Sequence, residues 1–175
     1  MSSSTEFTPL GMAVLTVSDT RDESNDSSGQ YLAGALADEG HRLVAKQIVK
    51  DDIYQIRATV SAWIADADIE VVVITGGTGF SGRDSTPEAV SVLFDKVIEG
   101  FGEVFRAVSL TEIGSSTIQS RAVAGLANNT VIFCMPGSTG ACKTAWQQVI
   151  RDQLDSRHRP CNFVGVLKVR ANTVT

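Results

Sequence analysis

Four short runs rich in apolar residues, separated by segments with helical spacing, constrain the fold of this chain more than any other feature. Apolar runs of this length are typical of strands buried on both faces of a sheet. Strands that alternate with helices favour parallel pairing, because the connecting helices cover the faces of the sheet. We therefore predict an α/β fold of three layers, α/β/α, with a mostly parallel sheet. The predicted strands are MAVLTV (12–17), LVAKQIV (43–49), EVVVIT (70–75) and VIFCM (131–135).

The first two helices are predicted from the spacing of apolar residues and from capping residues. The first covers about residues 29–39, with Ser28 as its N-cap and Gly40 as its stop. The second covers about residues 53–64, where isoleucine, valine and tryptophan recur at helical spacing. Each lies between two predicted strands, as a parallel sheet requires.

The second half of the chain is less regular. A helix is predicted after Thr86 as its N-cap, continuing to about residue 109 with breaks at Gly100 and Gly102. Residues 114–129 are polar and rich in small side chains, and the pattern assigns them no element. A last helix is predicted over about residues 139–153.

The length of 175 residues allows one domain with a well-buried core. No internal repeat, linker or second domain is visible. We predict a loose N-terminal tail at 1–10, a single domain at 11–168 and a C-terminal tail at 169–175.

Composition excludes several classes of function. The net charge is −5 and no basic stripe occurs, which argues against nucleic-acid binding. No apolar run approaches the roughly 20 residues of a membrane span, and the first eleven residues do not resemble a signal peptide. The three cysteines include no C-x-x-C pair. A reducing, cytoplasmic setting is therefore expected.

The topology places four loops at one edge of the predicted sheet. They follow the four strands, and ligands of open α/β sheets bind at the carboxyl ends of the strands. Together the loops offer glycine amides, hydroxyl groups and carboxylates. The loops are SDTR (18–21), KDD (50–52), GGTGFSGRD (76–84) and PGSTG (136–140).

Residues 76–84, here called the glycine loop, match two phosphate-binding patterns in part. Gly77–Gly82 fits G-x-G-x-x-G, but it follows the third strand, the next helix begins late, and no strand-end acid follows about 20 residues on. A P-loop requires Lys and Ser or Thr where Arg83 and Asp84 stand. Four glycines in seven residues exceed what a turn needs. Phosphate binding through backbone N–H groups is therefore favoured over a plain turn.

Carboxylates and hydroxyl groups extend this interpretation. Asp84 stands inside an anion-binding loop, which a bridging Mg²⁺ would explain, since Mg²⁺ prefers one or two carboxylates plus phosphates. Asp51 and Asp52 could supply a second carboxylate or could cap the following helix. Arg83 is expected to pair with Asp84 or with phosphate. The Pro-Gly-Ser loop (136–139) leads from a strand to a helix start and resembles a second phosphate-binding turn.

The histidines lie outside these loops. His41 and His158 are the only two in the chain, and no Ser–His–Asp set or metal-binding His/Cys cluster is visible. A reaction that needs a histidine base is therefore not expected. Phosphoryl or nucleotidyl transfer to an anionic nucleophile fits better, because it depends on positioning and charge neutralisation.

The chain resembles the molybdopterin-binding MoaB/Mog family over about residues 10–165. The resemblance lies in VSDTR…DSSG (17–29), ITGGTGFSGRDSTPEA (74–89) and MPGST (135–139). Three further segments resemble the bacterial MoaB branch in particular: FGEVFR (101–106), QSRAVAG (119–125) and RPCNF (159–163). The resemblance implies a three-layer α/β fold and a place in molybdenum cofactor biosynthesis. It also implies a homotrimer or hexamer, and other proteins of that pathway as partners.

The resemblance implies a reaction and a set of site residues. ATP, with Mg²⁺ as cofactor, reacts with molybdopterin to give adenylyl-molybdopterin and pyrophosphate. Asp84 and Asp51 match the family's catalytic aspartates and are the expected magnesium ligands, with Asp52 as a substitute for Asp51. The expected ligand-binding residues are Ser18, Gly76, Gly77, Thr78, Gly79, Thr86, Pro136, Gly137 and Ser138.

Two further functions are compatible with the sequence. Lys50 replaces the proline that usually precedes the first aspartate, and Thr139 replaces the proline that often follows the Pro-Gly-Ser serine. These differences favour a non-catalytic molybdopterin-binding carrier or scaffold as the alternative to an adenylyltransferase. A third possibility is an unrelated nucleotide-binding α/β protein, which would bind ATP but no pterin.

Overall fold

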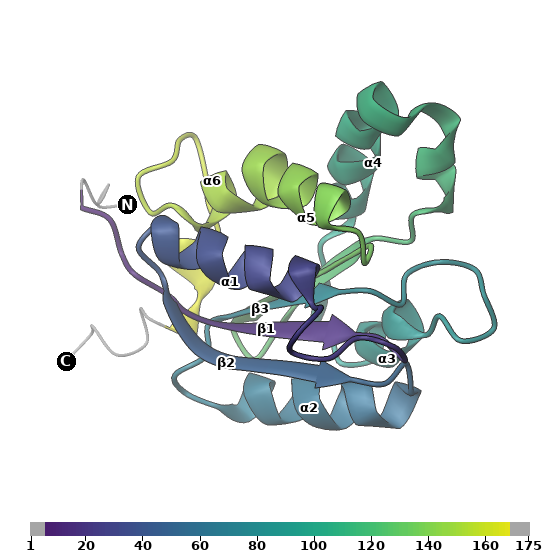
Figure 1. Ribbon diagram of the computed structural model, residues 1–175. Helices are drawn as coiled ribbons and strands as arrows, with labels where there is room; N and C mark the ends of the chain where they lie inside the picture. The colour runs from purple at the N-terminus through teal and green to yellow at the C-terminus, as the bar shows by residue number, and fades with distance from the viewer. Residues whose placement is uncertain (1–5, 169–175) are drawn as a thin grey trace.

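The computed structural model describes residues 6–168, and six strands alternate with helices along this part of the chain (Figure 1). The strands are β1 Gly11–Val17, β2 Arg42–Val49, β3 Val71–Thr75, β4 Lys96–Val97, β5 Val123–Ala127 and β6 Thr130–Met135. The α-helices are α1 Ser27–Asp38, α2 Ile53–Ala65, α3 Thr86–Ser91, α4 Glu99–Ile113, α5 Thr139–Ala145 and α6 Arg151–Leu154. Shorter helical segments are η1 Gly114–Gln119, the π-helical η2 Trp146–Ile150 that joins α5 to α6, and η3 Val164–Val166.

The six strands form one mixed sheet in the order β2-β1-β3-β6-β5-β4. The pairs β1/β2, β1/β3 and β3/β6 are parallel, whereas β5 is antiparallel to both of its neighbours. The four predicted strands are thus the parallel part of the sheet, and the expectation of a mostly parallel sheet is confirmed.

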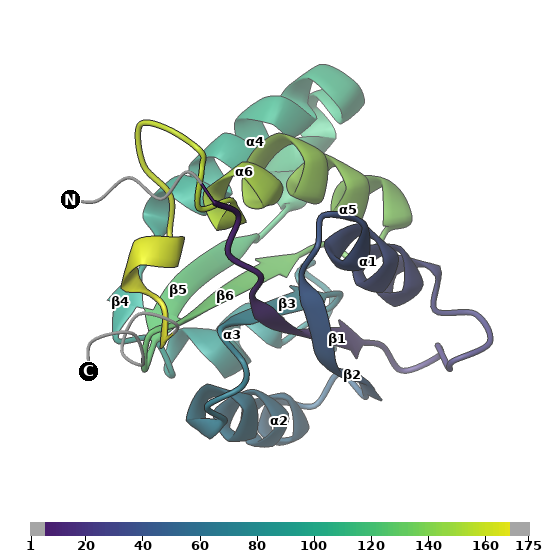
Figure 2. The ribbon, with the colours of Figure 1, turned by 90° about the vertical axis from the view of Figure 1, so that its left-hand side faces the viewer.

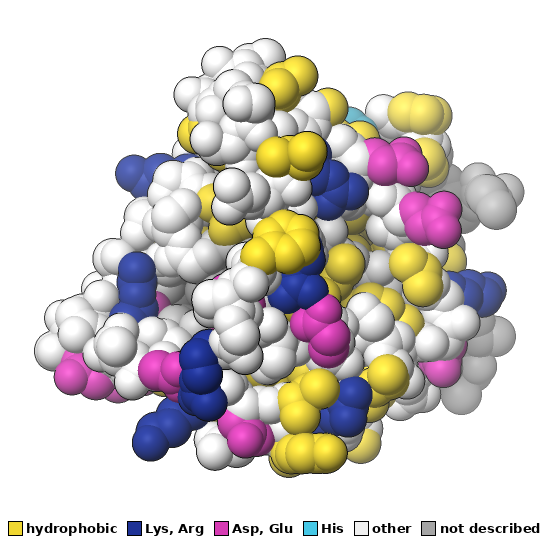
Figure 3. Space-filling view, turned by 90° about the vertical axis from the view of Figure 1, so that its right-hand side faces the viewer, with side chains coloured by type: hydrophobic (Ala, Val, Ile, Leu, Met, Phe, Trp, Pro, Cys, Tyr) yellow, Lys and Arg dark blue, Asp and Glu magenta, His cyan; other side chains and the backbone are white. Residues whose placement is uncertain are grey.

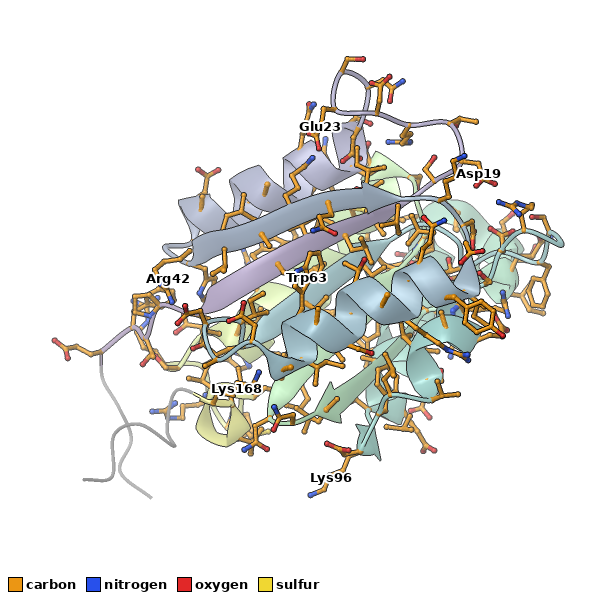
Figure 4. All side chains as sticks on the ribbon, turned by 90° about the horizontal axis from the view of Figure 1, so that it is seen from below. Asp19, Glu23, Arg42, Trp63, Lys96 and Lys168 are labelled. Carbon is orange, nitrogen blue, oxygen red and sulfur yellow. The ribbon has the colours of Figure 1, made fainter. Side chains whose placement is uncertain are left out.

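Helices cover both faces of the sheet, which confirms the three-layer architecture. Helices α1, α4, α5 and α6 lie on one face, and α2 and α3 lie on the other (Figures 1 and 2). Each face has its own apolar core. Leu32 of α1 and Phe105 of α4 pack in the first core, while Val60 and Trp63 of α2 pack in the second. Figure 4 shows α2 lying across the sheet, with Trp63 labelled.

The prediction of one long helix after Thr86 is wrong, because two separate helices occupy these residues. Helix α3 ends at Ser91 and α4 begins at Glu99. Between them the backbone joins the sheet, since β4 pairs with β5 and Ile98 N donates to Ala124 O. The predicted breaks at Gly100 and Gly102 lie inside α4. A pairing with a distant strand outweighed the local helical spacing here.

The unassigned residues 114–129 contain η1 and the first strand and turn of a β-hairpin. Strand β5 returns to β6 through Asn128 and Asn129, whose φ angles are 48° and 56°. Positive φ at both positions is the requirement of the tight turn that joins antiparallel strands, and asparagine tolerates it. This two-asparagine signal could have been recognised in the sequence.

Two predicted caps are also corrected. Helix α1 is capped by Asp26, whose carboxylate accepts from Gly29 N, while Ser28 lies inside the helix and donates to Gly137 O at 2.7 Å. Thr86 is the first residue of α3, and its hydroxyl donates to Gly76 O at 2.8 Å. Both hydroxyl groups bind neighbouring loops, which local sequence cannot indicate.

The ends of the predicted domain are described only in part. Residues 1–5 of the predicted N-terminal tail, and all of the predicted tail 169–175, lie outside the described residues. Within the described part, Leu10 is fully buried and Thr8 N donates to Ser156 Oγ at 2.9 Å, so residues 6–10 contact the folded body. The division at 10/11 and 168/169 stays a prediction. None of the helices in residues 6–168 has both the length and the apolar character needed to cross a bilayer.

Candidate functional site

A cavity of about 580 Å³ lies where the parallel strands end. We call it the edge cavity. Figure 3 shows the face toward which strands β1–β3 point, where acidic and basic side chains lie beside one another. The lining residues come from the ends of β1, β3 and β6, from the glycine loop, and from the region of η1. They are Thr16, Val17, Ser18, Arg21, Thr75, Gly76, Gly77, Thr78, Gly79, Asp84, Ile113, Ser116, Gln119, Ser120, Pro136, Gly137 and Ser138.

Most of the predicted site residues meet in this cavity. Those that line it are Ser18, Gly76, Gly77, Thr78, Gly79, Asp84, Pro136, Gly137 and Ser138. Asp51 and Thr86 do not line it, and neither does any other residue of the predicted loop at 50–52. Three of the four predicted edge loops therefore form the cavity, and the fourth lies behind it. The roles of these residues toward a ligand stay predictions.

Glycine is required at the start of the glycine loop. Gly76 and Gly77 have φ angles of 101° and 67°, which residues with a Cβ rarely adopt. A Cβ on Gly76 would lie 2.2 Å from Val17 O, and one on Gly77 would lie 2.3 Å from Thr86 Oγ1. The loop thus passes directly against β1 and the start of α3, with its backbone facing the cavity.

Hydrogen bonds tie the glycine loop to its surroundings. Gly76 N donates to Met135 O at 3.0 Å, and Thr75 Oγ1 donates to Pro136 O at 3.1 Å. Thr86 holds the loop through its hydroxyl bond to Gly76 O and through its backbone N–H, which donates to Gly77 O at 3.0 Å. Thr86 therefore shapes the glycine loop from behind, and the β3 and β6 loops are fixed to each other.

Asp51 also supports this region from behind. Its side chain accepts from both Ser85 N at 3.1 Å and Ser85 Oγ at 2.7 Å, and the residue is only 8% exposed. Burial raises the pKa of the Asp51 carboxyl, and the nearby charges of Asp84 and Asp19 raise it further. A Cβ on Gly77 would lie 2.7 Å from Asp51 Oδ2, so this carboxylate lies directly under the glycine loop.

Asp84 is the one predicted carboxylate that lines the cavity. Its Oδ2 accepts from Ser81 N at 2.9 Å and lies 2.9 Å from where a Cβ on Gly79 would be, so the carboxylate is part of the glycine loop. Residues 6–168 contain no group of three or more His, Cys, Asp or Glu side chains that could hold a metal. One carboxylate at the edge cavity nevertheless fits Mg²⁺ bound mainly through phosphate oxygens and water.

Arg83 pairs with Asp19 and not with its predicted partner Asp84, while its pairing with phosphate stays a prediction. Its guanidinium donates to Asp19 through Nη2 at 2.8 Å and Nε at 2.9 Å. Asp19 follows β1 and is labelled in Figure 4 at the end of the sheet where the glycine loop lies. Asp19 also accepts from Asp51 N at 3.2 Å, so this ion pair links the β1, β2 and glycine loops. The Arg83 side chain holds the pKa of the Asp19 carboxyl below its usual range.

Arg21 is the functional candidate that the sequence interpretation missed. It is the only basic residue among those that line the edge cavity. Its guanidinium donates to Gly137 O at 3.4 Å and to the hydroxyl groups of Ser27 and Ser28 at 3.3 Å. The arginine was visible at the end of the predicted loop at 18–21, but only the fold shows that it reaches the Pro-Gly-Ser loop. A guanidinium at this place is suited to bind phosphate oxygens.

The wall opposite the strands was also missed, because the sequence pattern assigned no element to it. The cavity is lined from the end of α4, from η1 and from the residue after η1, by Ile113, Ser116, Gln119 and Ser120. Ser120 Oγ is buried without a hydrogen-bond partner in the described structure. Unsatisfied buried hydroxyl groups are uncommon in proteins. This wall therefore adds polar side chains to the cavity that the strand-end loops do not supply.

The fold and the cavity define an α/β protein with a cavity at the carboxyl edge of its sheet, lined by glycine-loop backbone and by Arg21. Comparison with known proteins gives the family. Residues 13–156 match the family model of a probable molybdopterin binding domain. The chain belongs to this molybdopterin-binding family, of the MoaB/Mog type, and the resemblance to the MoaB branch is confirmed.

Relatives of known sequence and structure agree with this membership. The chain is 59% identical over 165 residues to molybdenum cofactor biosynthesis protein B of Escherichia coli K12, covering 94% of this chain and 97% of that protein. It is 47% identical over 142 residues to the protein of that name in Bacillus cereus, covering 81% and 84% of the two chains. A crystal structure of a molybdenum cofactor biosynthesis protein B matches with a TM-score of 0.82 at 45% identity, covering 84% and 92%. The tungsten cofactor synthesizing protein MoaB from Pyrococcus furiosus matches with a TM-score of 0.76 at 36% identity, covering 83% and 92%.

Proposed function

We propose that this protein acts in molybdenum cofactor biosynthesis and transfers the adenylyl group of Mg-ATP to molybdopterin. The family membership and the names of the relatives support the pathway. The observation that carries the reaction is the edge cavity, where glycine-loop backbone, Arg21 and Asp84 line one space. Backbone amides and a guanidinium suit phosphate groups, and a carboxylate suits a magnesium ion bound to them.

The chemistry fits a site without a histidine base. A terminal phosphate oxygen of molybdopterin forms a bond to the α-phosphorus of ATP, and the bond to the bridging oxygen of the β-phosphate breaks. Pyrophosphate leaves with the electron pair of that bond. The attacking oxygen is already anionic, so no proton must be removed, and catalysis rests on positioning and charge neutralisation.

The described residues divide this work among three groups. The glycine loop and Arg21 would bind phosphate oxygens, and the η1 wall with Gln119 and Ser120 would contact a non-phosphate part of a substrate. Asp84 would hold Mg²⁺, which neutralises phosphate charge when bound. Asp51 is expected to act on the site through Ser85 and the glycine loop, because its carboxylate is buried beneath them.

The experiment compares the wild type with Asp84→Asn. Purified protein is mixed with Mg-ATP and molybdopterin, and adenylyl-molybdopterin and pyrophosphate are quantified. Asp84→Asn is expected to lower the rate about 100-fold or more, because the amide cannot supply the negative charge for the metal. The fold should survive, since the side-chain oxygen of the substituted amide can still accept from Ser81 N. The matched control is Asp38→Asn, the same change at the exposed end of α1, outside the cavity.

Each result has a separate meaning. Wild-type turnover by Asp84→Asn would remove Asp84 from the reaction. No product from the wild type, with molybdopterin still bound, would favour the non-catalytic carrier or scaffold. One observation favours that alternative, since Asp84 is the only carboxylate among the residues that line the cavity. Binding of ATP without any affinity for a pterin would instead favour an unrelated nucleotide-binding protein.

A further inference from the structure

Arg121 makes an unusual set of contacts with the glycine loop. Its Nε donates to Gly79 O at 2.9 Å and to Thr78 O at 3.3 Å, and its Nη2 donates to Asp84 O at 3.2 Å. Its backbone N–H also donates to Thr78 O, at 3.3 Å. One residue, placed just before β5, thus binds three carbonyl groups of a loop about 40 residues away in the sequence.

Two side-chain contacts fix the guanidinium in this place. Arg121 Nη1 forms an ion pair with Glu88 in the first turn of α3. The guanidinium carbon lies 5.2 Å from the centre of the Phe80 ring, within the range of a cation–π contact. The side chain is only 24% exposed. Because Nε, Nη1 and Nη2 each have an acceptor and Phe80 lies within cation–π range, the position of the guanidinium relative to the loop is set.

The carbonyl contacts have a consequence for the amide groups. In a trans peptide the C=O and N–H groups point in opposite directions. The carbonyls of Thr78 and Gly79 point to Arg121, so the N–H groups of Gly79 and Phe80 point away from it. Arg121 does not line the edge cavity, whereas Thr78 and Gly79 do. The guanidinium therefore contacts these carbonyls from outside the lining of the cavity.

We propose that Arg121 is a positioning residue that turns glycine-loop carbonyls away from the edge cavity and so presents the opposite N–H groups to a ligand phosphate. Carbonyl oxygens facing a phosphate would repel it, while N–H groups attract it. The inference rests on the proposed function, because it concerns the phosphates of the nucleotide or pterin substrate.

The test uses the full chain with Arg121→Lys and Arg121→Ala. Binding of Mg-ATP and of pyrophosphate is measured by calorimetry, followed by the rate of adenylyl-molybdopterin formation. Lysine keeps the charge but lacks the planar fork that reaches several carbonyls at once. Both variants are expected to raise the Kd of both probes by about tenfold to 100-fold, the range for hydrogen bonds to a charged group.

Loop order is measured without a ligand by limited chymotrypsin digestion. Phe80 in the glycine loop is 70% exposed, and Tyr54 on α2 is 72% exposed and serves as the internal reference. Arg121→Lys should speed cleavage at Phe80 and leave Tyr54 unchanged. The matched control is Arg57→Lys, because Arg57 donates to the carbonyls of Glu88 and Ala89, which lie outside the glycine loop. The Arg57 guanidinium lies 5.8 Å from the centre of the Tyr54 ring, so only cleavage at Phe80 is compared in this variant.

The outcomes separate the inference from the proposed function. Wild-type affinity and wild-type cleavage in Arg121→Lys would overturn the positioning role. Equal losses in Arg57→Lys would also overturn it, because they would show a general effect on stability. A wild type that binds pyrophosphate but forms no product would refute the adenylyl transfer, and the variants would still decide the role of Arg121. A wild type that binds neither probe would overturn both.

Discussion

His41 illustrates at the residue scale how burial changes the behaviour of a side chain. The residue is 6% exposed, its Nδ1 accepts from Leu10 N at 3.2 Å, and its ring lies 5.1 Å from that of Phe7. Burial lowers the pKa of the imidazole from its usual 6.5 to about 4, although Asp155 opposes the shift. The ring is therefore neutral in the folded protein at neutral pH and accepts the Leu10 amide.

We expect the free energy of unfolding to fall as the pH falls from about 6.5 toward 4. In this window His41 of the unfolded chain is protonated while the folded imidazole stays neutral, so protons favour unfolding. The contribution is at most about 1.4 kcal/mol per pH unit. Urea unfolding of the wild type and of His41→Asn, at several pH values, measures it. Asparagine can accept from Leu10 N without titrating, so an unchanged pH slope in the variant would contradict this role.

At the scale of elements, helix α1 depends on a buried cap. Asp26 is fully buried, accepts from Gly29 N at 3.0 Å and from Thr16 Oγ1 at 2.9 Å, and lies 3.2 Å from Lys46 Nζ. One carboxylate thus joins α1 to β1 and β2. These partners compensate the buried negative charge of Asp26. Removal of the carboxylate would leave the Lys46 charge and the two donors without their acceptor.

Asp26→Ala is expected to lower the free energy of unfolding by about 3 kcal/mol, the cost of breaking a buried charge pair. Asp52→Ala is the matched control, because Asp52 caps α2 in the same way but is partly exposed. That change should cost only about 1 kcal/mol. Asp26→Asn keeps an oxygen that can cap the helix, so its loss in free energy of unfolding should lie between those of the two alanine variants. Equal losses for the two alanine variants, measured by urea unfolding, would show that the buried network adds nothing to the cap.

Elements were predictable from sequence where one local pattern acted alone. The strands β1, β2, β3 and β6 and helices α1 and α2 were expected within a few residues. The region from α3 to β5 was not predicted correctly, because β4 and β5 form only through their pairing with each other and with β6. The two residues of β4 are too few to show a pattern, and β5 consists mostly of alanine and glycine, which do not favour strands.

For the whole molecule, the family resemblance predicts a homotrimer or hexamer. Described apolar side chains such as Leu110 and Ile118, 55% and 76% exposed, lie on α4 and η1 and are of the kind that an interface covers. Light scattering at micromolar concentration should give three or six times the mass of the chain. An oligomer should also unfold at higher urea as the protein concentration rises. A single-chain mass across the dilution series would exclude the prediction.

The sequence by itself determined the parallel layers, the edge where the loops meet, and the glycines that bend the loop at β3. Apolar runs, helical spacing and glycine clusters act over a few neighbouring residues, so they can be recognised without the fold. The exclusion of nucleic acid and the cytoplasmic setting stay predictions from composition.

Only the tertiary structure decided which of these residues meet. It placed Asp51 beneath the glycine loop and Arg83 on Asp19, and it brought Arg21 to the cavity. It also brought Arg121 across about 40 residues of sequence to three carbonyl groups. Every residue has a backbone carbonyl, so a side chain that binds carbonyls requires no particular residue type in its partner. Neither the arginine nor the loop therefore shows the contact in its own sequence. The pairing of β5 with β6 placed Arg121 beside the glycine loop, while the other contacts join loops that follow the parallel strands at one edge of the sheet.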